Sequence, residues 1–327
     1  MRTLLRSSAM TLALLPAFAH AGQSDLVWRN TATGQTVLWK SANAAQTVAL
    51  PIVPTAWRIA AVADFDGDTV ADLLWRNAAT GQNRIWRMGN AQLQIVVATV
   101  AAPWDIVGAG DFDYDGAADI LWRNAVTGAN RIWRSGNVAT QVALPSVLNG
   151  WTVAGVGDFD LDHYDDILWR NARTGANTAW RRGNAATQRP IASVGNPAWT
   201  IAGIGDFGGD GGDDLLWRNT ATGENIVWHS AYPSTFTTQR LASVPNMAWR
   251  IAATGDFNGD ARADVLWRNT ATGQDTVWLS GLAGTQAPCA TVASAQWSVV
   301  GAGEFDAPAA PPEPPPMPPP YPPPYPY

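Results

Sequence analysis

The sequence has little of several residue types on which common protein classes depend. Only 15% of its 327 residues are charged, whereas a typical soluble domain has about 25%. It has one cysteine, which excludes a scaffold stapled by internal disulfides. The formal net charge of −6 argues against a nucleic-acid partner, because phosphate binding needs a basic surface. With 46% hydrophobic residues the chain can bury a large core, unlike a disordered protein.

Long apolar runs are absent except at the extreme N-terminus. Residues 1–21 are predicted to be a secretory signal peptide, with Arg2 and Arg6 in a positive segment, an apolar stretch over 9–19 and an Ala19-His20-Ala21 cleavage site. The alternative is a short buried helix, since the run is too short to span a bilayer. No second apolar stretch follows, so we expect a secreted product, extracellular or periplasmic, without a membrane span.

The C-terminal segment, residues 307–327, contains 13 of the 23 prolines. Such a composition does not build a sheet and predicts a disordered or extended polyproline II segment. It is either a spacer or a docking peptide. The folded part of the chain is therefore expected over residues 22–306.

Tryptophan is abundant instead, and its 18 residues form three series of six. The first series lies in Trp-Arg-Asn triplets at Trp28, Trp75, Trp122, Trp169, Trp217 and Trp267. The second series lies eleven residues further on, at Trp39, Trp86, Trp133, Trp180, Trp228 and Trp278. The third series is Trp57, Trp104, Trp151, Trp199, Trp249 and Trp297. Self-similarity at this period indicates a repeat architecture.

Each repeat is predicted to contain four short β-strands, as the copy that starts at Trp104 illustrates. The first two strands are expected over 104–110 and 119–124, the second of which alternates with a period of two. An Asn-x-x-Thr-Gly turn with Gly128 at a positive φ leads into a third strand around 131–133. A weaker apolar run over 138–144 supplies the fourth. Four strands in roughly 40–50 residues is the size of a β-propeller blade.

The two ends of the repeat region complement each other. It opens at Asp25–Asn30, which corresponds to strand two, and closes at Trp297–Phe305, which corresponds to strand one. We therefore predict an all-β fold, a six-bladed β-propeller of four-stranded blades. Its last blade takes strand one from the C-terminus and strands two to four from the N-terminus, which leaves no exposed edge. Two three-fold trefoils in tandem are the alternative, and they give no reason for complementary ends.

Acidic residues recur between strands one and two of five repeats, in segments that we call loops 1 to 5. Counting the first aspartate of each loop as position 1, acids recur at positions 3, 5 and 9. Loops 1 to 3 contain Asp64, Asp66, Asp68 and Asp72; Asp111, Asp113, Asp115 and Asp119; and Asp158, Asp160, Asp162 and Asp166. Loops 4 and 5 contain Asp206, Asp210 and Asp214, and Asp256, Asn258, Asp260 and Asp264.

These carboxylates would repel one another without a cation, and oxygen ligands in such numbers suit Ca²⁺. The backbone carbonyl of position 7 can add a ligand, from Val70, Ala117, Tyr164, Gly212 and Arg262. We predict about four to five Ca²⁺ sites of this kind. An EF-hand is excluded, because its Glu at position 12 and its flanking helices are missing. The alternative is a set of solvated acidic turns that bind no metal.

The loops differ from one another. In loop 4, Gly208 stands at position 3, where Asp213 is a candidate to compensate, and in loop 5 the amide oxygen of Asn258 replaces a carboxylate. A sixth, split loop, here called loop 6, would lack a position 5 acid, and we expect it to be weak or empty. It would draw on both chain ends, from Glu304, Asp306 and Asp25.

The repeat, G-x-G-D-F-D-G-D-x-x-x-D-L-L-W-R-N, resembles the FG-GAP or VCBS-type repeats of integrin-α-like propellers and of many exported bacterial proteins. The resemblance covers about residues 24–306. It implies a calcium-stabilised β-propeller with the acidic loops on one rim. It implies no single function, since the family includes adhesion modules, lectins and propeller domains of lyases. Thr69, His163 and Ala261 depart from the glycine that is common at position 6.

Residues suited to catalysis are scarce. After removal of the signal peptide only His163 and His229 remain, and neither a G-x-S-x-G nor an H-E-x-x-H motif is present. We expect His163 to be a turn residue and His229 to lie at the surface. The sequence therefore predicts no enzyme activity, and a propeller domain of a polysaccharide-degrading enzyme is the alternative.

The leading hypothesis is an exported, monomeric binding or adhesion module for a protein or polysaccharide, without a nucleic-acid partner. A lectin is the sharper alternative, in which Trp86 with Arg84, and Trp133 with Arg131, form stacking platforms between blades. The other interpretation is that these rings pack blade against blade. The arginines of the Trp-Arg-Asn triplets are predicted to be structural, each bonding a neighbouring turn. Cys289 is predicted to be a buried free thiol.

Overall fold

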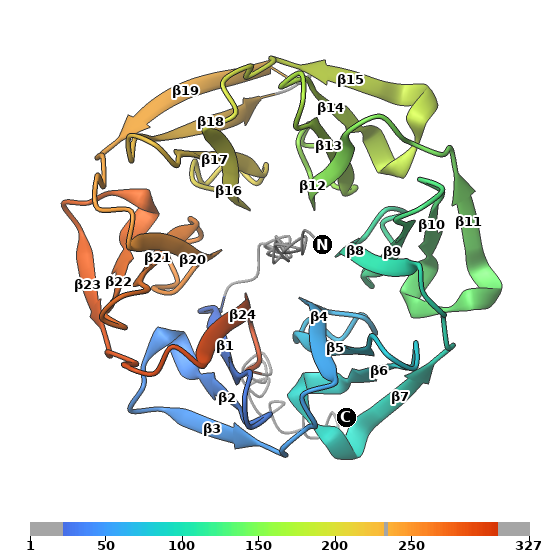
Figure 1. The fold of residues 1–327 in the computed structure, drawn as a ribbon, viewed down its shortest axis with the longest axis horizontal. Coiled ribbons are helices and arrows are strands. Elements are labelled where there is room, and N and C mark those ends of the chain that lie inside the picture. The colour runs from blue at the N-terminus through green and yellow to red at the C-terminus, as the bar shows by residue number, and fades with distance from the viewer. Residues whose placement is uncertain (1–21, 232–234, 307–327) are drawn as a thin grey trace, which may run out of the picture.

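The computed structural model describes residues 22–231 and 235–306. These residues form six four-stranded antiparallel sheets arranged as the blades of a ring around a central channel (Figure 1). Within the described residues there is no α-helix, only short 3₁₀ turns. The predicted signal peptide and the proline-rich tail lie outside the described residues.

Each blade runs from an inner strand at the channel to an outer strand at the rim (Figure 1). Blade 1 consists of β4 (Trp57–Ala63), β5 (Asp72–Asn77), β6 (Asn83–Trp86) and β7 (Gln94–Val97). Blade 2 consists of β8 (Trp104–Gly110), β9 (Asp119–Asn124), β10 (Asn130–Trp133) and β11 (Gln141–Leu144). Blade 3 consists of β12 (Trp151–Gly157), β13 (Asp166–Asn171), β14 (Asn177–Trp180) and β15 (Gln188–Ile191).

The remaining blades repeat this order. Blade 4 consists of β16 (Trp199–Gly205), β17 (Asp214–Asn219), β18 (Asn225–Ala231) and β19 (Thr235–Leu241). Blade 5 consists of β20 (Trp249–Gly255), β21 (Asp264–Asn269), β22 (Asp275–Trp278) and β23 (Gln286–Cys289). Blade 6 consists of β24 (Trp297–Gly303), β1 (Asp25–Asn30), β2 (Thr36–Trp39) and β3 (Thr47–Leu50).

Short 3₁₀ turns follow the strands. Five of them come directly after strand three, at η1 (Lys40–Ala42), η2 (Arg87–Gly89), η4 (Arg134–Gly136), η6 (Arg181–Gly183) and η8 (Leu279–Gly281). Three more precede strand four, at η3 (Ala91–Leu93), η5 (Val138–Thr140) and η7 (Ala185–Thr187). The predicted fourth strand over 138–144 is therefore too long. Its first residues form η5, because the Asn137 side chain accepts a hydrogen bond from the backbone of Ala139.

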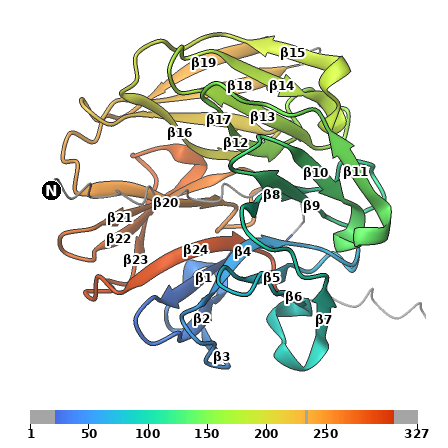
Figure 2. The same cartoon turned by 45° about the vertical axis from the view of Figure 1, so that its right-hand side comes forward.

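Blade 6 confirms the predicted closure of the ring by both chain ends. β24 pairs antiparallel with β1, with Trp28 opposite Val299, and the two strands lie side by side in Figures 1 and 2. The tandem-trefoil alternative is wrong, because six sheets follow one another around a single channel.

Small residues let the inner strands approach one another. A Cβ added to Gly108 in β8 would lie only 2.7 Å from Cγ2 of Val156 in β12. In the turns after strand two, Gly128 has a φ of +69°, and a Cβ there would lie 2.2 Å from the carbonyl oxygen of Val147. Both positions therefore need glycine, the first for space and the second also for its backbone conformation.

A closed circle of backbone hydrogen bonds joins each blade to the previous one. In every blade the N–H of loop position 8 donates to the position 1 carbonyl of the preceding blade, over 2.5–2.8 Å. The donor–acceptor pairs are Ala71–Glu304, Ala118–Asp64, Asp165–Asp111, Asp213–Asp158, Ala263–Asp206 and Ser24–Asp256. The acidic loops are therefore coupled directly to one another around the channel.

The tryptophans form the core of the ring. First-series rings are 1–2% exposed, and each packs on the second-series ring of its own blade with centroids 4.8–5.0 Å apart. Trp86 and Trp133 are only 7% and 3% exposed. Each of these rings also belongs to a core cluster that spans two blades, Trp86 with Leu38 of blade 6 and Trp133 with Ile85 of blade 1. The packing of blade against blade is thus confirmed, and these rings offer no open stacking platform of the kind the lectin alternative requires.

The triplet arginines connect neighbouring blades. Each guanidinium lies over the first-series tryptophan of the next blade, 4.8–5.0 Å from the ring centroid. Arg123, for example, stacks on Trp169 and donates to the carbonyl oxygens of Val147 at 2.6 Å and Trp151 at 3.1 Å. The predicted structural role of these arginines is confirmed.

Candidate metal-binding loops

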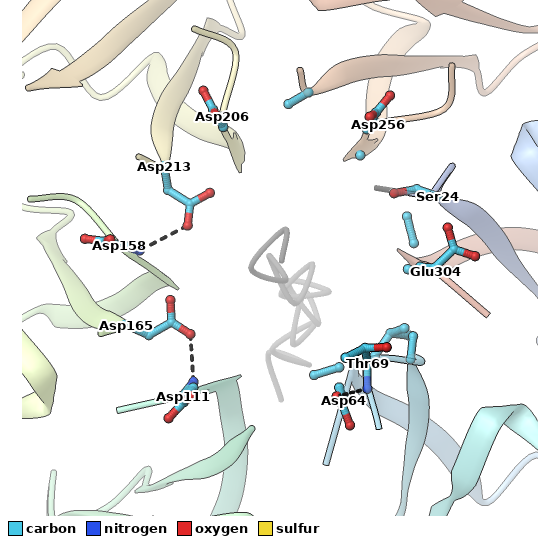
Figure 3. A pocket seen from close by; sticks show the side chains of 18 of the residues that line it. Ser24, Asp64, Thr69, Asp111, Asp158, Asp165, Asp206, Asp213, Asp256 and Glu304 are labelled. Carbon is cyan, nitrogen blue, oxygen red and sulfur yellow. Dashed lines mark hydrogen bonds between the residues drawn. The ribbon is translucent and has the colours of Figure 1, made fainter. Parts of the chain in front are cut away.

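The acidic loops gather at one end of the central channel. All six follow the end of an inner strand, and their position 1 residues line a cavity of about 440 Å³ (Figure 3). These residues are Asp64, Asp111, Asp158, Asp206, Asp256 and Glu304. The starts of the inner strands, with the third-series tryptophans, therefore lie at the opposite end of the channel.

The position 1 carboxylate shapes each loop, as Asp64 shows in loop 1. Its Oδ1 accepts hydrogen bonds from the backbone N–H groups of Asp66, Gly67 and Asp68, at 3.2, 2.8 and 3.3 Å. Its Oδ2 accepts from the N–H of Thr69 at 2.7 Å. The loop backbone therefore wraps around one carboxylate before any ligand is considered.

The position 9 carboxylate ties the loop to the rest of its blade. Asp72 is fully buried and accepts from the N–H of Phe65 at 2.9 Å and from that of Met88, in η2, at 2.8 Å. Burial raises the pKa of Asp72 to about 7, and it raises the pKa of Asp119 and Asp264 to the same value. These acids carry their charge only at a cost that a bound cation would offset.

The position 3 carboxylates are the strongest sign that loops 1 to 3 fit a cation. Oδ1 of Asp66, of Asp113 and of Asp160 is buried and has no hydrogen-bond partner. In each of these loops three carboxylates bring ligand atoms within 4.8 Å of one another. Burial, followed by the neighbouring aspartates, raises the pKa of Asp113 and Asp160. A buried carboxylate oxygen without a partner is costly, and a divalent cation supplies one.

Loops 4 and 5 are less complete. Among the described residues, neither brings three carboxylates together as loops 1 to 3 do. Asp213 Oδ2 accepts from the N–H of Asp158, at 3.0 Å, in the preceding blade, while its buried Oδ1 has no partner. Compensation for Gly208 by Asp213 remains a prediction. In loop 5, Asn258 Oδ1 accepts from the N–H of Asp260 at 2.9 Å, so its amide oxygen is already engaged.

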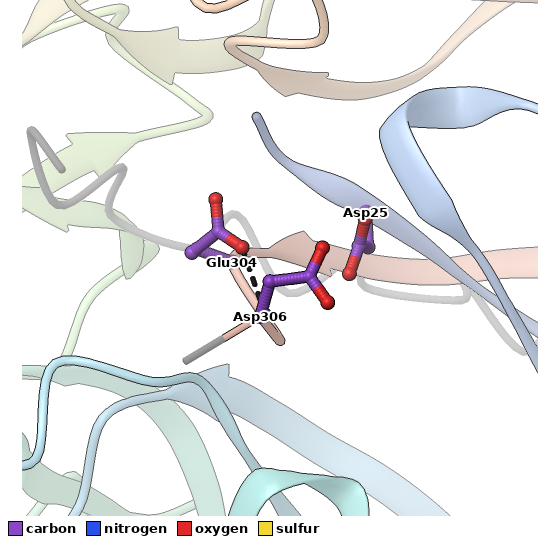
Figure 4. Close-up of side chains that lie close together, drawn as sticks. All are labelled: Asp25, Glu304 and Asp306. Carbon is purple, nitrogen blue, oxygen red and sulfur yellow. Dashed lines mark hydrogen bonds between the residues drawn. The ribbon is translucent and has the colours of Figure 1, made fainter. Parts of the chain in front are cut away.

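Loop 6 assembles from both chain ends, as Figure 4 shows for Asp25, Glu304 and Asp306. The three carboxylates lie within 4.8 Å of one another. Lys40 Nζ lies 2.8 Å from both Asp25 Oδ2 and Asp306 Oδ1. An ammonium group therefore already neutralises part of this loop.

The structure confirms the predicted turn at loop position 6 but does not test the predicted ligand role of position 7. At position 6 the residues Thr69, His163 and Ala261 have φ values of +70°, +67° and +61°, as the glycines of other loops do, so His163 is a turn residue as expected. At position 7 the backbone N–H donates to the position 5 carboxylate in every loop from 1 to 5. A role for the position 7 carbonyls as ligands remains a prediction.

A residue outside the loops also reaches them, although the loop motif does not include it. It is the residue directly after the second-series tryptophan, here called the post-tryptophan residue. His229 is one of these: it is not at the open surface but 21% exposed, with Nδ1 2.7 Å from Asp214 Oδ2. A Cβ on Gly208 would lie 3.5 Å from the same nitrogen, so the imidazole stands where position 3 lacks a side chain. The sequence does contain a pattern that indicates this position, because the residue after the second-series tryptophan is basic in all blades except one.

The predicted sugar-stacking residues are arranged differently from the expectation. Arg84 and Arg131 do not pair with Trp86 and Trp133 but lie over third-series rings of their own blades. Arg84 lies 5.1 Å from the centroid of Trp57, and Arg131 lies 4.5 Å from that of Trp104. Cys289 is a free, half-buried thiol near Ala42, and burial raises its pKa to about 12.

One family model matches part of the chain. The sequence profile of the FG-GAP repeat matches residues 248–280, which include loop 5. The sequence matches no curated protein. Within the described residues, no helix is long and apolar enough to cross a membrane.

Solved structures with a similar chain path share little sequence. A catalytically inactive virginiamycin B lyase from Staphylococcus aureus is 9% identical, with a TM-score of 0.50 over 88% of this chain and 87% of that one. A calcium-binding regucalcin from Agrobacterium tumefaciens is 13% identical, with a TM-score of 0.43 over 67% of this chain and 70% of that one. The V. cholerae biofilm matrix protein Bap1 is 14% identical, with a TM-score of 0.33 over 88% of this chain and 42% of that one. Of these, the likeness to the lyase shows the fold alone.

Proposed function

We propose, from the premise that the chain is an FG-GAP-type β-propeller, that it is an exported calcium-binding module that presents its surface to a protein or polysaccharide. One observation carries the metal part of the proposal. Three loops each hold a buried position 3 carboxylate oxygen without a hydrogen-bond partner, amid two further carboxylates. When bound, Ca²⁺ would supply a shared positive partner for these oxygens.

The residues that would hold the ion also connect the blades. In loop 2 the carboxylate of Asp111 accepts from the backbone of its own loop, while its carbonyl accepts from Asp165 of the next blade at 2.8 Å. Ordering position 1 in one loop therefore also orders the junction with the next blade. Calcium in this proposal stiffens the ring rather than taking part in chemistry, and we propose no catalytic role for the chain.

A titration of the purified full chain with CaCl₂, followed by calorimetry, tests the metal part. We expect binding of about three ions at the loops with complete carboxylate clusters, and weaker binding elsewhere. Mg²⁺ at the same concentration is the control, because it prefers a smaller octahedral site. A titration in which Ca²⁺ gives no binding heat would contradict the proposal.

A lectin is the second candidate, and the third-series tryptophans favour it. All six are half-buried at the starts of the inner strands, at the end of the channel opposite the acidic loops. In blade 3 the ring of Trp151 has Thr178 where Arg84 and Arg131 stand in blades 1 and 2. Partly exposed aromatic rings at a repeated spacing suit stacking by sugar units of a polysaccharide.

A glycan array probed with and without Ca²⁺ distinguishes the two ligand classes. The lectin candidate predicts binding that Trp151→Ala weakens. The matched control in the same blade is Arg189→Ala, an exposed residue on the outer strand β15. Glycan binding that Trp151→Ala leaves unchanged would refute this placement of the sugar site. If no glycan binds, the protein-binding module is the candidate that remains.

A further inference from the structure

The post-tryptophan residue carries a positive or titratable side chain in every blade except blade 5. Around the ring this position is occupied by Lys40, Arg87, Arg134, Arg181, His229 and Leu279. Each lies fifteen residues after position 9 of its own loop, at the end of strand three. Because position 9 starts strand two, antiparallel pairing of strands two and three places the two residues opposite each other.

Backbone hydrogen bonds fix this arrangement. In blade 2, Ile120 pairs with Trp133, so Arg134 follows directly at the level of Asp119. The next residue, Ser135, donates its N–H to Asp119 Oδ1 at 2.8 Å and anchors η4 against the loop. The same bond recurs in the other blades, for example from Arg182 to Asp166 at 2.9 Å. These bonds therefore hold the post-tryptophan residue, which directly precedes the donor, next to the loop.

In loops 1 to 3 the arginine contacts the position 3 acid, and in loops 1 and 3 it also reaches the position 5 acid. Arg134 Nη1 lies 3.0 Å from Asp113 Oδ2 in loop 2. Arg181 contacts Asp160 through Nε, and its Nη2 lies 2.8 Å from Asp162 Oδ2 in loop 3. The same oxygen lies 3.0 Å from Nε of the more exposed Arg182. In loop 1, Arg87 contacts the Asp66 carboxylate and lies 3.6 Å from Asp68. These are the carboxylates that a divalent cation needs, and Asp160 is only 1% exposed with its Oδ1 still unpartnered.

Blade 5 provides a natural contrast. Its post-tryptophan residue, Leu279, packs against the hydrophobic core. Among the ion pairs of the described residues, none involves the loop 5 acids Asp256, Asp260 and Asp264. The cationic residue within loop 5, Arg262 at position 7, turns away from the loop 5 acids. Its Nε lies beside Gly209 of loop 4, 3.1 Å from where a Cβ on that glycine would stand.

We propose that the post-tryptophan residue is a built-in counter-cation that sets how strongly each loop requires and binds a divalent ion. The inference rests on the proposed calcium binding. In the metal-free protein the guanidinium neutralises position 3 in loops 1 to 3 and position 5 in loops 1 and 3. Ca²⁺ must displace it, since two cations on the same oxygens repel each other. Arg134 and Arg181 are 48% and 24% exposed, so each can move outward into solvent. Loop 5 has no such competitor and binds without this displacement.

Two substitutions in opposite directions test the proposal. Replacing all three arginines, as Arg87→Leu, Arg134→Leu and Arg181→Leu, removes the competitor, and the dissociation constant of these loops for Ca²⁺ is expected to fall at least tenfold, about 1.4 kcal/mol. In EDTA the same variant is expected to melt below wild type, because the carboxylates lose their counter-charge. Leu279→Arg is expected to weaken Ca²⁺ binding by loop 5 by a similar factor.

The measurements are calorimetric titration of the full chain with CaCl₂ and thermal unfolding in EDTA. The matched control is Arg173→Leu, which removes an exposed arginine from the turn at the other end of blade 3. If the triple variant does not fold, Arg134→Gln alone replaces it, since that side chain is half-exposed and makes one ion pair.

Two outcomes would overturn the inference, and they are distinguishable. If wild type binds Ca²⁺ but the arginine variants bind it no more tightly than Arg173→Leu does, the counter-cation role is wrong and calcium binding stands. If neither wild type nor any variant binds Ca²⁺, the proposed calcium function fails and this inference fails with it. Tighter binding by the triple variant together with weaker binding by Leu279→Arg supports it.

Discussion

Replacing the position 3 carboxylates by amides is expected to act oppositely on the metal-free and the calcium-loaded protein. The variant is Asp66→Asn, Asp113→Asn and Asp160→Asn, which installs in loops 1 to 3 the residue type that loop 5 has in Asn258. Each substitution removes a charge whose Oδ1 is buried without a partner. The ion pair lost with it leaves a partly exposed arginine that solvent can hydrate, so that loss costs little. The metal-free variant is therefore expected to be at least as stable as wild type, whereas the loaded variant loses three anionic ligands.

The size of the effect follows from mass action. Extracellular calcium modules bind with dissociation constants of about 10⁻⁴ to 10⁻³ M. At about 5 mM Ca²⁺, each occupied loop then adds about 1–2.3 kcal/mol to the free energy of unfolding, and three loops add about 3–7 kcal/mol. A domain of about 280 residues unfolds with an entropy near 0.6 kcal/mol/K, so the wild-type Tm is expected to rise by about 5–12 °C. If amides weaken binding tenfold, the rise falls to about 1–5 °C.

The assay is thermal unfolding in CaCl₂ and in EDTA at matched ionic strength. Glu224→Gln is the control, because it removes an exposed acid from the turn between β17 and β18, at the end of blade 4 opposite loop 4, where Oε1 lies 3.5 Å from Arg240 Nη1. A full wild-type calcium shift in the triple variant would refute position 3 as a ligand. A wild-type Tm that Ca²⁺ does not change would refute metal binding by the loops altogether.

Three further predictions concern the metal-free ring. The pKa values of Asp72, Asp119 and Asp264 are raised to about 7, foremost by burial. A carboxyl group with a raised pKa in the folded protein stabilises folding fully at pH values below its unfolded pKa near 3.8. This contribution is lost as the pH rises through about 7. Urea unfolding in EDTA should therefore give a lower free energy at pH 8 than at pH 5, by at least about 1.4 kcal/mol, and equal values would contradict the burial of these acids. Arg123→Met removes the stack on the next blade and leaves buried carbonyls without donors, so a loss of about 3–5 kcal/mol in urea unfolding is expected; Arg123→Lys should recover little of it, because lysine lacks the planar fork. Thr69→Gly removes the strain of a β-branched residue at a φ of +70°. The free energy of unfolding is expected to rise by about 0.5–1 kcal/mol, seen as a higher urea midpoint, and an unchanged midpoint would show that the turn is unstrained.

Periodicity alone was enough to predict the blades. Strands β8 and β9 have the bounds expected from the alternation of apolar residues, and β24 completes blade 6 as the complementary ends required. The physical reason is that each blade is a local unit. Its strands pair with neighbours close in sequence, so turn residues and alternation determine them without knowledge of distant contacts.

Contacts between blades were not predictable in the same way. Asp213 occupies the position next to a metal-loop acid, yet its carboxylate turns to the N–H of Asp158 in the preceding blade. Trp86 could equally have faced a sugar or a neighbouring ring, and burial against Trp75 decided it. Such choices depend on the angle at which two sheets meet, which no single repeat encodes.

The sequence by itself determined the number of blades, the closure of the ring and the composition of each acidic loop, because these depend on spacing and on residue type. Only the tertiary structure decided which groups share a loop. It placed Arg134 and its equivalents against the loop acids and brought Asp25 together with Glu304 and Asp306. The reason is that antiparallel pairing and ring closure bring together charges that are distant in the chain, and electrostatics acts on distance in space.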